Sequence, residues 1–199
     1  MTDLMNRPHP DCPADCPGTA ERGVDRQEPG TGERLNRLRA AVLGANDGIV
    51  STAAVVVGVA GATSDQTTIA MSGLAAVIGG AVSMALGEYV SVSSQRDSER
   101  AMGLAKEMQV NPWSAAVASF LSFLLGAALP FATALLAPAS WRIAAIFMLT
   151  LVALALTGAL SAKLGEAPVA RSVARIVGGG TMALAATFAI GSLFGANVG

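Results

Sequence analysis

The sequence predicts an all-α membrane protein with five transmembrane helices, and three observations support this class. The chain has 199 residues, of which 52% are hydrophobic and only 14% are charged. Its charged residues gather in clusters separated by long uncharged runs. Five of these runs can cross ~30 Å of hydrocarbon at ~1.5 Å per helical residue. The composition therefore indicates an integral membrane protein rather than a soluble domain.

Residues 1–34 are rich in Pro, Gly and charged residues and contain few bulky apolar ones, so we expect a disordered cytoplasmic tail. The tail has no apolar run of the kind found in a signal peptide. Within it, His9, Cys12 and Cys16 stand close to two aspartates and could capture a soft or borderline divalent metal. A plain tail is the favoured alternative, because the Cys-x3-Cys spacing is a weak signature.

The tail also holds every histidine and cysteine of the chain. The predicted spans therefore contain no imidazole for catalysis and no thiol for redox chemistry. A net charge of −1 gives no electrostatic support for a nucleic-acid partner. We accordingly expect no enzyme activity and no cofactor.

The first predicted span, residues 38–62, carries one acid, Asp47, about a third of the way along. A charged carboxylate in the hydrocarbon region costs roughly 3 kcal/mol unless it binds a cation, takes up a proton or is hydrated. An acid at this depth therefore indicates function. Asn46, together with Ser51 or Thr52, gives weaker candidates for oxygen ligands.

The second predicted span, residues 69–94, carries Met84 and Glu88 one helical turn apart. With the two spans centred near their midpoints and running in opposite directions, Asp47 and Met84 share a layer ~4–6 Å from the bilayer centre. A carboxylate and a thioether suit a borderline-soft cation such as Fe2+. Glu88, one turn closer to the cytoplasm, is an entry ligand or a proton acceptor, or else it extends to the interface or pairs with Arg96.

Small residues surround these groups. Gly44 and Gly48 bracket Asp47, and the second span carries the small residues Gly79, Gly80, Ser83, Gly87 and Ser91. Small faces let helices approach closely in lipid, and they can also leave room for a hydrated path. Packing is the favoured interpretation for any one of these glycines.

The rest of the chain looks like scaffold. Residues 95–111 are charged and amphipathic, and we expect them to continue the second helix as a short cytoplasmic extension. The predicted spans 113–137, 141–162 and 172–195 have no acid or base in their centres, and Pro130 lies inside the first of them.

The basic residues predict the orientation. If the spans alternate, 12 of the 13 Lys and Arg residues fall on one side, and only Arg142 falls on the other. The positive-inside rule then places the N-terminus in the cytoplasm and the C-terminus outside. The membrane that we expect is the inner (plasma) membrane of the cell. Trp113 and Trp141 stand where interfacial aromatic anchors are expected.

Several segments resemble the vacuolar iron transporter family, in particular its bacterial membrane members. They are LRAAVLGANDGIVSTAAVVVGVAGA, SMALGEYVSVSSQRDSE, NPWSAAVASFLSFLLGAALP and LALTGALSAKLG. The resemblance covers nearly all of residues 35–195. It implies a five-span protomer, a homodimer with an ion path lined by the first two spans at the two-fold interface, and exchange of Fe2+ for protons. The family's pore aspartate and methionine fall on Asp47 and Met84.

The chain departs from the family pattern in two places. Characterised members have a further acid two turns before the methionine, where this chain has Ala76. Many members also insert a metal-collecting helical domain between spans two and three, where this chain has only residues 95–111, with Lys106 and Gln109 where ligating acids are expected. The cytoplasmic metal reservoir is therefore expected to be missing.

The sequence thus predicts a transporter that exports Fe2+, with Mn2+ as a second candidate, in exchange for protons. Asp47, Met84 and Glu88 are the predicted metal ligands. The alternative is a non-transporting membrane scaffold or partner subunit in which Asp47 makes an interhelical hydrogen bond.

Overall fold

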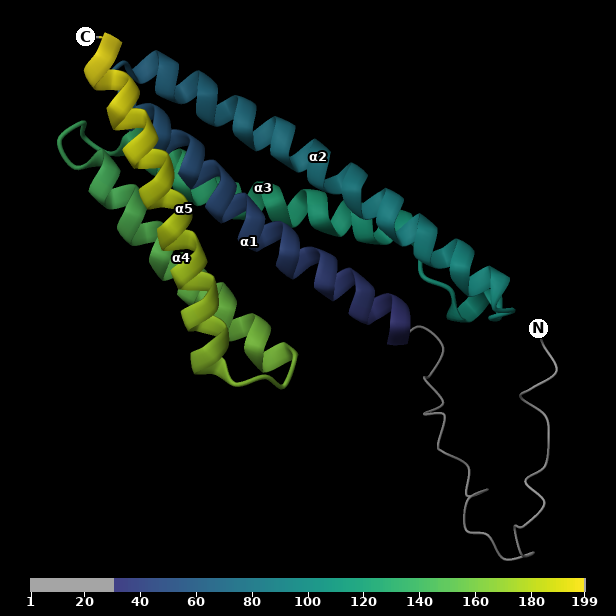
Figure 1. The fold of residues 1–199 in the computed structure, drawn as a ribbon. Coiled ribbons are helices and arrows are strands. Elements are labelled where there is room, and N and C mark those ends of the chain that lie inside the picture. Colours follow the sequence, from purple (N-terminus) through teal and green to yellow (C-terminus); the bar gives the residue numbers. More distant parts are fainter. Residues whose placement is uncertain (1–30, 199) are drawn as a thin grey trace, which may run out of the picture.

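The computed structural model describes residues 31–198, which form five long α-helices and one short 3-10 helix (Figure 1). The helices are α1 (Thr31–Ala62), α2 (Gln66–Ala101), η1 (Lys106–Met108), α3 (Pro112–Leu136), α4 (Arg142–Leu164) and α5 (Val169–Val198). All five α-helices are long and apolar enough to cross a membrane, which confirms the predicted all-α class and the predicted number of membrane-length helices.

The first helix begins earlier than expected. Residues 31–34, predicted as the end of a disordered tail, form the first turn of α1. The rest of the predicted tail, including the metal-binding hypothesis for His9, Cys12 and Cys16, lies outside the described residues.

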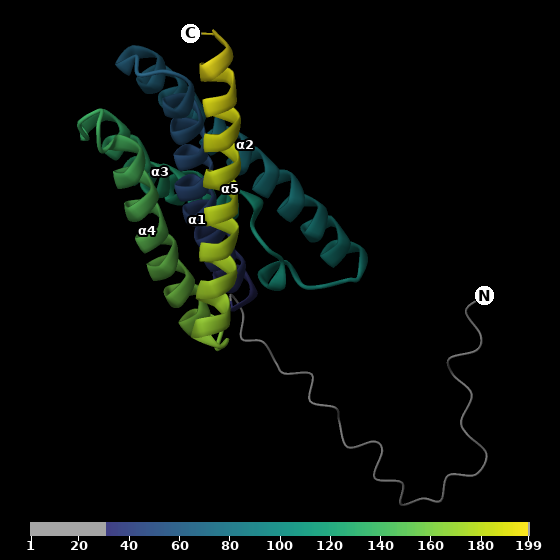
Figure 2. The same ribbon diagram turned by 60° about the vertical axis from the view of Figure 1, so that its left-hand side comes forward.

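Helix α1 is the centre of the fold and contacts each of the other four α-helices. In Figure 2, α5 lies in front of α1 with α4 beside it, whereas α2 packs mainly against α1 and α3. One buried cluster draws a side chain from every α-helix: Ala53, Val56, Val57, Ile69, Ala134, Ile146 and Leu184. This cluster lies toward the end of α1 that leads into the α1–α2 turn.

Glycines allow α1 and α3 to approach closely. A Cβ atom added to Gly48 would lie 2.2 Å from the carbonyl oxygen of Phe123, and one added to Gly44 would lie 2.5 Å from that of Ser119. In the reverse direction, a Cβ on Gly126 would lie 2.3 Å from the carbonyl oxygen of Ala45. The Gly44–Gly48 pair therefore packs α1 onto α3, as the packing interpretation predicts.

The same device joins α1 to α5. A Cβ added to Gly191 would lie 1.9 Å from the carbonyl oxygen of Gly58, and one on Gly195 would lie 2.7 Å from that of Ala62. The backbone of α1 thus lies close to the backbone of α3 along its first half and close to the backbone of α5 along its second half.

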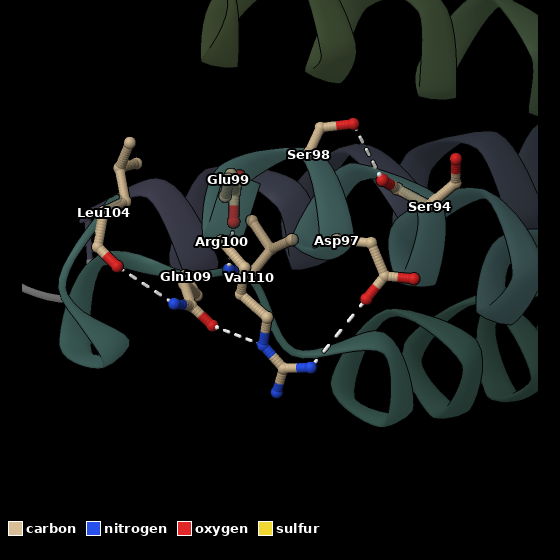
Figure 3. A network of polar contacts seen from close by, with 8 residues as sticks. All are labelled: Ser94, Asp97, Ser98, Glu99, Arg100, Leu104, Gln109 and Val110. Atoms are coloured by element: carbon tan, nitrogen blue, oxygen red, sulfur yellow. Dashed lines mark hydrogen bonds and ion pairs between the residues drawn. The ribbon is translucent and has the colours of Figure 1, made fainter. Parts of the chain in front are cut away.

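The connection from α2 to α3 folds back instead of continuing as a helix. The predicted helical extension over 95–111 is α-helical only as far as Ala101, because Gly103 adopts a left-handed φ of 77° that reverses the chain. Figure 3 shows how the returning segment is held: the carboxylate of Glu99 accepts a 2.9 Å hydrogen bond from the Val110 amide, and Arg100 donates to Gln109. Val110 is then buried against Ala40, Val92 and Ala115.

The opposite end of the bundle is fixed by polar contacts at the helix ends. Asp65 caps α2, and hydrogen bonds from the Thr68 hydroxyl and amide lower the pKa of its carboxyl. Gln66 accepts a hydrogen bond from the buried guanidinium of Arg142 and donates to carbonyls at the end of α3. These contacts tie the start of α2 to the α3–α4 turn.

The glycine contacts give a stability prediction. The substitution Gly48→Ala should lower the free energy of unfolding by about 1–3 kcal/mol, because α1 and α3 would have to separate to make room for the methyl group. We expect Gly178→Ala, a control on α5 with no atom within 4 Å of its Cβ position, to be neutral or slightly stabilising. Denaturation in detergent would measure both; equal stability of the two variants would contradict the packing account.

Candidate functional site

Asp47 lies near the middle of α1, directly before Gly48. Because Gly44 and Gly48 hold the backbone against α3, the helix cannot rotate freely about its axis at this level. One side of α1 carries Leu43, Asp47, Ser51 and Val55, which follow one another at intervals of four residues. Leu43 and Val55 are 45% and 38% exposed, and the two polar residues between them are half-buried. The carboxylate therefore lies on the side of α1 that the protomer covers least.

Asp47 is oriented from within its own helix. The Ser51 hydroxyl donates a 2.8 Å hydrogen bond to the Oδ1 atom of Asp47. No other hydrogen bond or ion pair to Asp47 occurs within the described part of the chain. Its Oδ2 atom therefore remains available to a cation, a proton or water.

Asn46, the neighbour of Asp47, makes a hydrogen bond to another helix. Its Oδ1 atom accepts a 2.6 Å hydrogen bond from the Thr157 hydroxyl on α4. One lone pair of the amide oxygen is thus used to join α1 to α4. Thr157 lies in a span that the sequence analysis assigns to the scaffold. Its hydrogen bond to Asn46 depends on the packing of α4 against α1.

Met84 is half-buried on α2 and packs against the cluster formed by Ala81, Phe123 and Ala127. Its neighbours Ser83 and Gly87 on the same helix are exposed. The thioether thus lies at the boundary between the α2–α3 contact and the uncovered side of α2.

Glu88 is the most deeply buried acid of the described chain, at 5% exposure, and it is paired. Its Oε2 atom lies 3.0 Å from the Nη2 atom of Arg39 on α1, and the same nitrogen donates a 3.2 Å hydrogen bond to Asn36. The alternative pairing with Arg96 is wrong: Arg96 lies two turns further along α2, whereas Arg39 reaches Glu88 from the adjacent helix. The sequence pattern indicates Arg39 only as one of the basic residues at the cytoplasmic end of the first span.

A single protomer does not assemble a multidentate acid cluster. Among residues 31–198, no group of three His, Cys, Asp or Glu side chains is arranged to hold a metal ion. Near the predicted layer the protomer offers one open carboxylate, Asp47, and one acid already neutralised by an arginine, Glu88. Asp97 and Glu99 lie at the end of α2, where Glu99 serves the chain reversal.

The Arg39–Glu88 pair gives a second prediction. The substitution Arg39→Gln should cost about 1–3 kcal/mol of stability, because it leaves a buried carboxylate without its charged partner. The double variant Arg39→Gln/Glu88→Gln should recover part of this loss. Unfolding measurements on both single variants and the double variant give the coupling free energy, and strictly additive losses would show that the ion pair contributes nothing.

Comparison with known proteins identifies a family that covers most of the described chain. The VIT family pattern matches residues 38–107 and 101–192. Vacuolar iron transporter homolog 1 of Arabidopsis thaliana is 44% identical over 173 residues, covering 83% of this chain and 86% of that protein. Vacuolar iron transporter homolog 1 of Oryza sativa subsp. japonica is 42% identical over 194 residues, covering 88% of this chain and 84% of that protein.

These matches exceed what a shared helical bundle alone would give, because they extend through nearly the whole of both chains. VIT family members are transporters and not enzymes, in agreement with the expectation from the sequence. The chain belongs to the VIT family and is a multi-pass membrane protein homologous to vacuolar iron transporters.

Proposed function

We propose that the chain exports Fe2+ from the cytoplasm in exchange for protons, with Mn2+ as a second substrate. The observation that carries this proposal is the half-buried carboxylate of Asp47, which has one hydrogen-bond partner and lies on the least covered side of the central helix. An acid retained in a membrane span without a cationic partner is typical of an ion or proton path.

The orientation follows from charge. All the basic residues of the described chain except Arg142 lie toward the ends of the α-helices that meet at the η1 side of the bundle. The positive-inside rule assigns this side to the cytoplasm and supports an N-terminus inside; the membrane that we propose is the plasma membrane. Trp113 and Trp141, both strongly exposed, support an interfacial position for the starts of α3 and α4.

We further propose that the functional unit is a homodimer formed through the open face of α2. This face consists of the exposed small residues Ala75, Gly79, Ser83, Gly87 and Ser91 with the exposed apolar residues Leu74, Ile78, Val82, Leu86 and Val90. Each set repeats every four residues, as in the ridges of closely packed helices.

The glycines of α2 separate into two classes that support this interface. Gly73 and Gly80 are needed inside the protomer, since a Cβ there would meet Phe131 and Phe123 within 2.8 and 2.3 Å. Gly79 and Gly87 have no atom within 4 Å of that position. Each such glycine costs about 1 kcal/mol of helix propensity relative to alanine. A second copy that packs closely against them would account for this cost.

In this arrangement, Asp47 of each subunit would bind the metal near the midplane. Ser51 holds one oxygen of the carboxylate, which leaves the other free for the cation. Met84 would favour borderline-soft cations over Mg2+ and Ca2+. Protons entering from outside would protonate the carboxylates and release the metal, since a protonated acid is a poor ligand. Glu88 serves as an entry ligand only when Arg39 moves away.

The scaffold alternative receives less support. It requires Asp47 to make an interhelical hydrogen bond, whereas the only hydrogen-bond partner of Asp47 among residues 31–198 is Ser51 on the same helix. The interhelical bond at this level is made by Asn46 instead.

Transport by purified protein in liposomes tests the role of Asp47. Under an imposed pH gradient, Asp47→Asn should reduce Fe2+ flux to the rate of protein-free liposomes, because the amide cannot exchange a proton for the cation. We expect Ser51→Ala to slow transport about tenfold by loosening the carboxylate. Asp97→Asn, at the exposed end of α2, is the matched control and should transport normally. Wild-type flux in a folded Asp47→Asn variant would refute the assignment.

A separate experiment tests the dimer. Gly79→Leu and Gly87→Leu each add a side chain where the protomer has open space, so the variants should fold but elute as monomers. Gly179→Leu, at an equally open glycine of α5, should remain dimeric. Light scattering after gel filtration in detergent reports the mass; dimers of unchanged stability in both α2 variants would exclude this face as the interface.

A further inference from the structure

A groove of about 470 Å³ lies between α1, α4 and α5 at the basic end of the bundle, and no residue of α2 lines it. Its walls are mostly aliphatic and include Leu35, Leu38, Val42, Leu164 and Ile176. Two arginines, Arg39 and Arg175, also line it. The groove therefore combines an apolar wall with two guanidinium groups.

The two guanidinium groups have unused hydrogen-bond donors. Arg175 is exposed and makes no hydrogen bond or ion pair with any residue between 31 and 198. Arg39 uses only its Nη2 atom, for Glu88 and Asn36, and 53% of its side chain is exposed. A guanidinium has five N–H donors, so both residues can still bind an oxyanion.

The lining selects among occupants. A free inorganic anion would gain nothing from the leucine and isoleucine walls, and a neutral acyl chain would gain nothing from two arginines. A molecule with an anionic phosphate joined to hydrocarbon chains matches both. Basic pockets between transmembrane helices at the cytoplasmic side are suited to such headgroups.

We propose that this groove is a binding site for an anionic phospholipid. The phosphate lies between Arg39 and Arg175, and an acyl chain follows the aliphatic wall between α1 and α4. Because Arg39 also holds Glu88, the bound phosphate shares a guanidinium with the α1–α2 ion pair and so touches the cytoplasmic end of the proposed ion path.

Native mass spectrometry of the full chain in neutral detergent, titrated with phosphatidylglycerol, tests the proposal. The wild type should retain one phosphatidylglycerol per protomer and should not retain phosphatidylcholine to the same extent. Arg175→Gln should weaken retention about fivefold, as expected for loss of one interfacial cation worth roughly 1 kcal/mol. Arg175→Lys should recover part of the affinity.

The matched control is Arg171→Gln, one turn earlier on α5, exposed and outside the groove. It should bind phosphatidylglycerol as the wild type does, and both glutamine variants should unfold at the wild-type temperature. An equal loss of phosphatidylglycerol retention in Arg171→Gln would show that the lipid is attracted by the general positive charge of this end and would overturn the proposed site. Equal retention of phosphatidylcholine, or full displacement of the lipid by inorganic phosphate at the same concentration, would also overturn it.

Discussion

The close contact of α1 with α3 and α5 is the constraint on which the rest of the structure depends. Gly44 and Gly48 bring one half of α1 against the backbone of α3, and Gly58 brings the other half against Gly191 of α5. In lipid there is no hydrophobic force between helices, so such contacts supply much of the attraction between them. They also fix the rotation of α1, and the position of Asp47 follows from that rotation.

The five spans could be predicted from the sequence because hydropathy and length alone determine which segments can cross a bilayer. The roles of the glycines could not. Gly44 and Gly79 look alike in the sequence, each within a small-residue repeat, yet the first is enclosed by α3 and the second faces open space. Which side of a helix meets a neighbour depends on the tertiary packing. The helical extension over 95–111 was wrong for a local reason, since Gly103 takes a left-handed conformation and the connection folds back.

The candidate site shows the same division. Asp47 could be identified from its depth because an intramembrane acid is costly wherever it points. The hydrogen bond between Ser51 and Asp47 could also be predicted from the sequence, because the two residues stand one helical turn apart. The Glu88–Arg39 and Asn46–Thr157 pairs join residues far apart in the chain, and nothing in the sequence relates them. Through these pairs, Glu88 and Asn46 are already bonded to other helices of the protomer, whereas Asp47 is bonded only within its own helix.

The central claim is that Asp47 faces its counterpart across the dimer, and site-directed cross-linking tests it most directly. In a chain with Cys12 and Cys16 replaced by serine, Asp47→Cys should form a covalent dimer with a short bifunctional thiol reagent in native membranes. Gly87→Cys on the open face of α2 should do so as well. If Gly87→Cys is cross-linked while Asp47→Cys stays monomeric, the dimer exists but its seam does not contain the carboxylate pair, and the account of the ion path is contradicted.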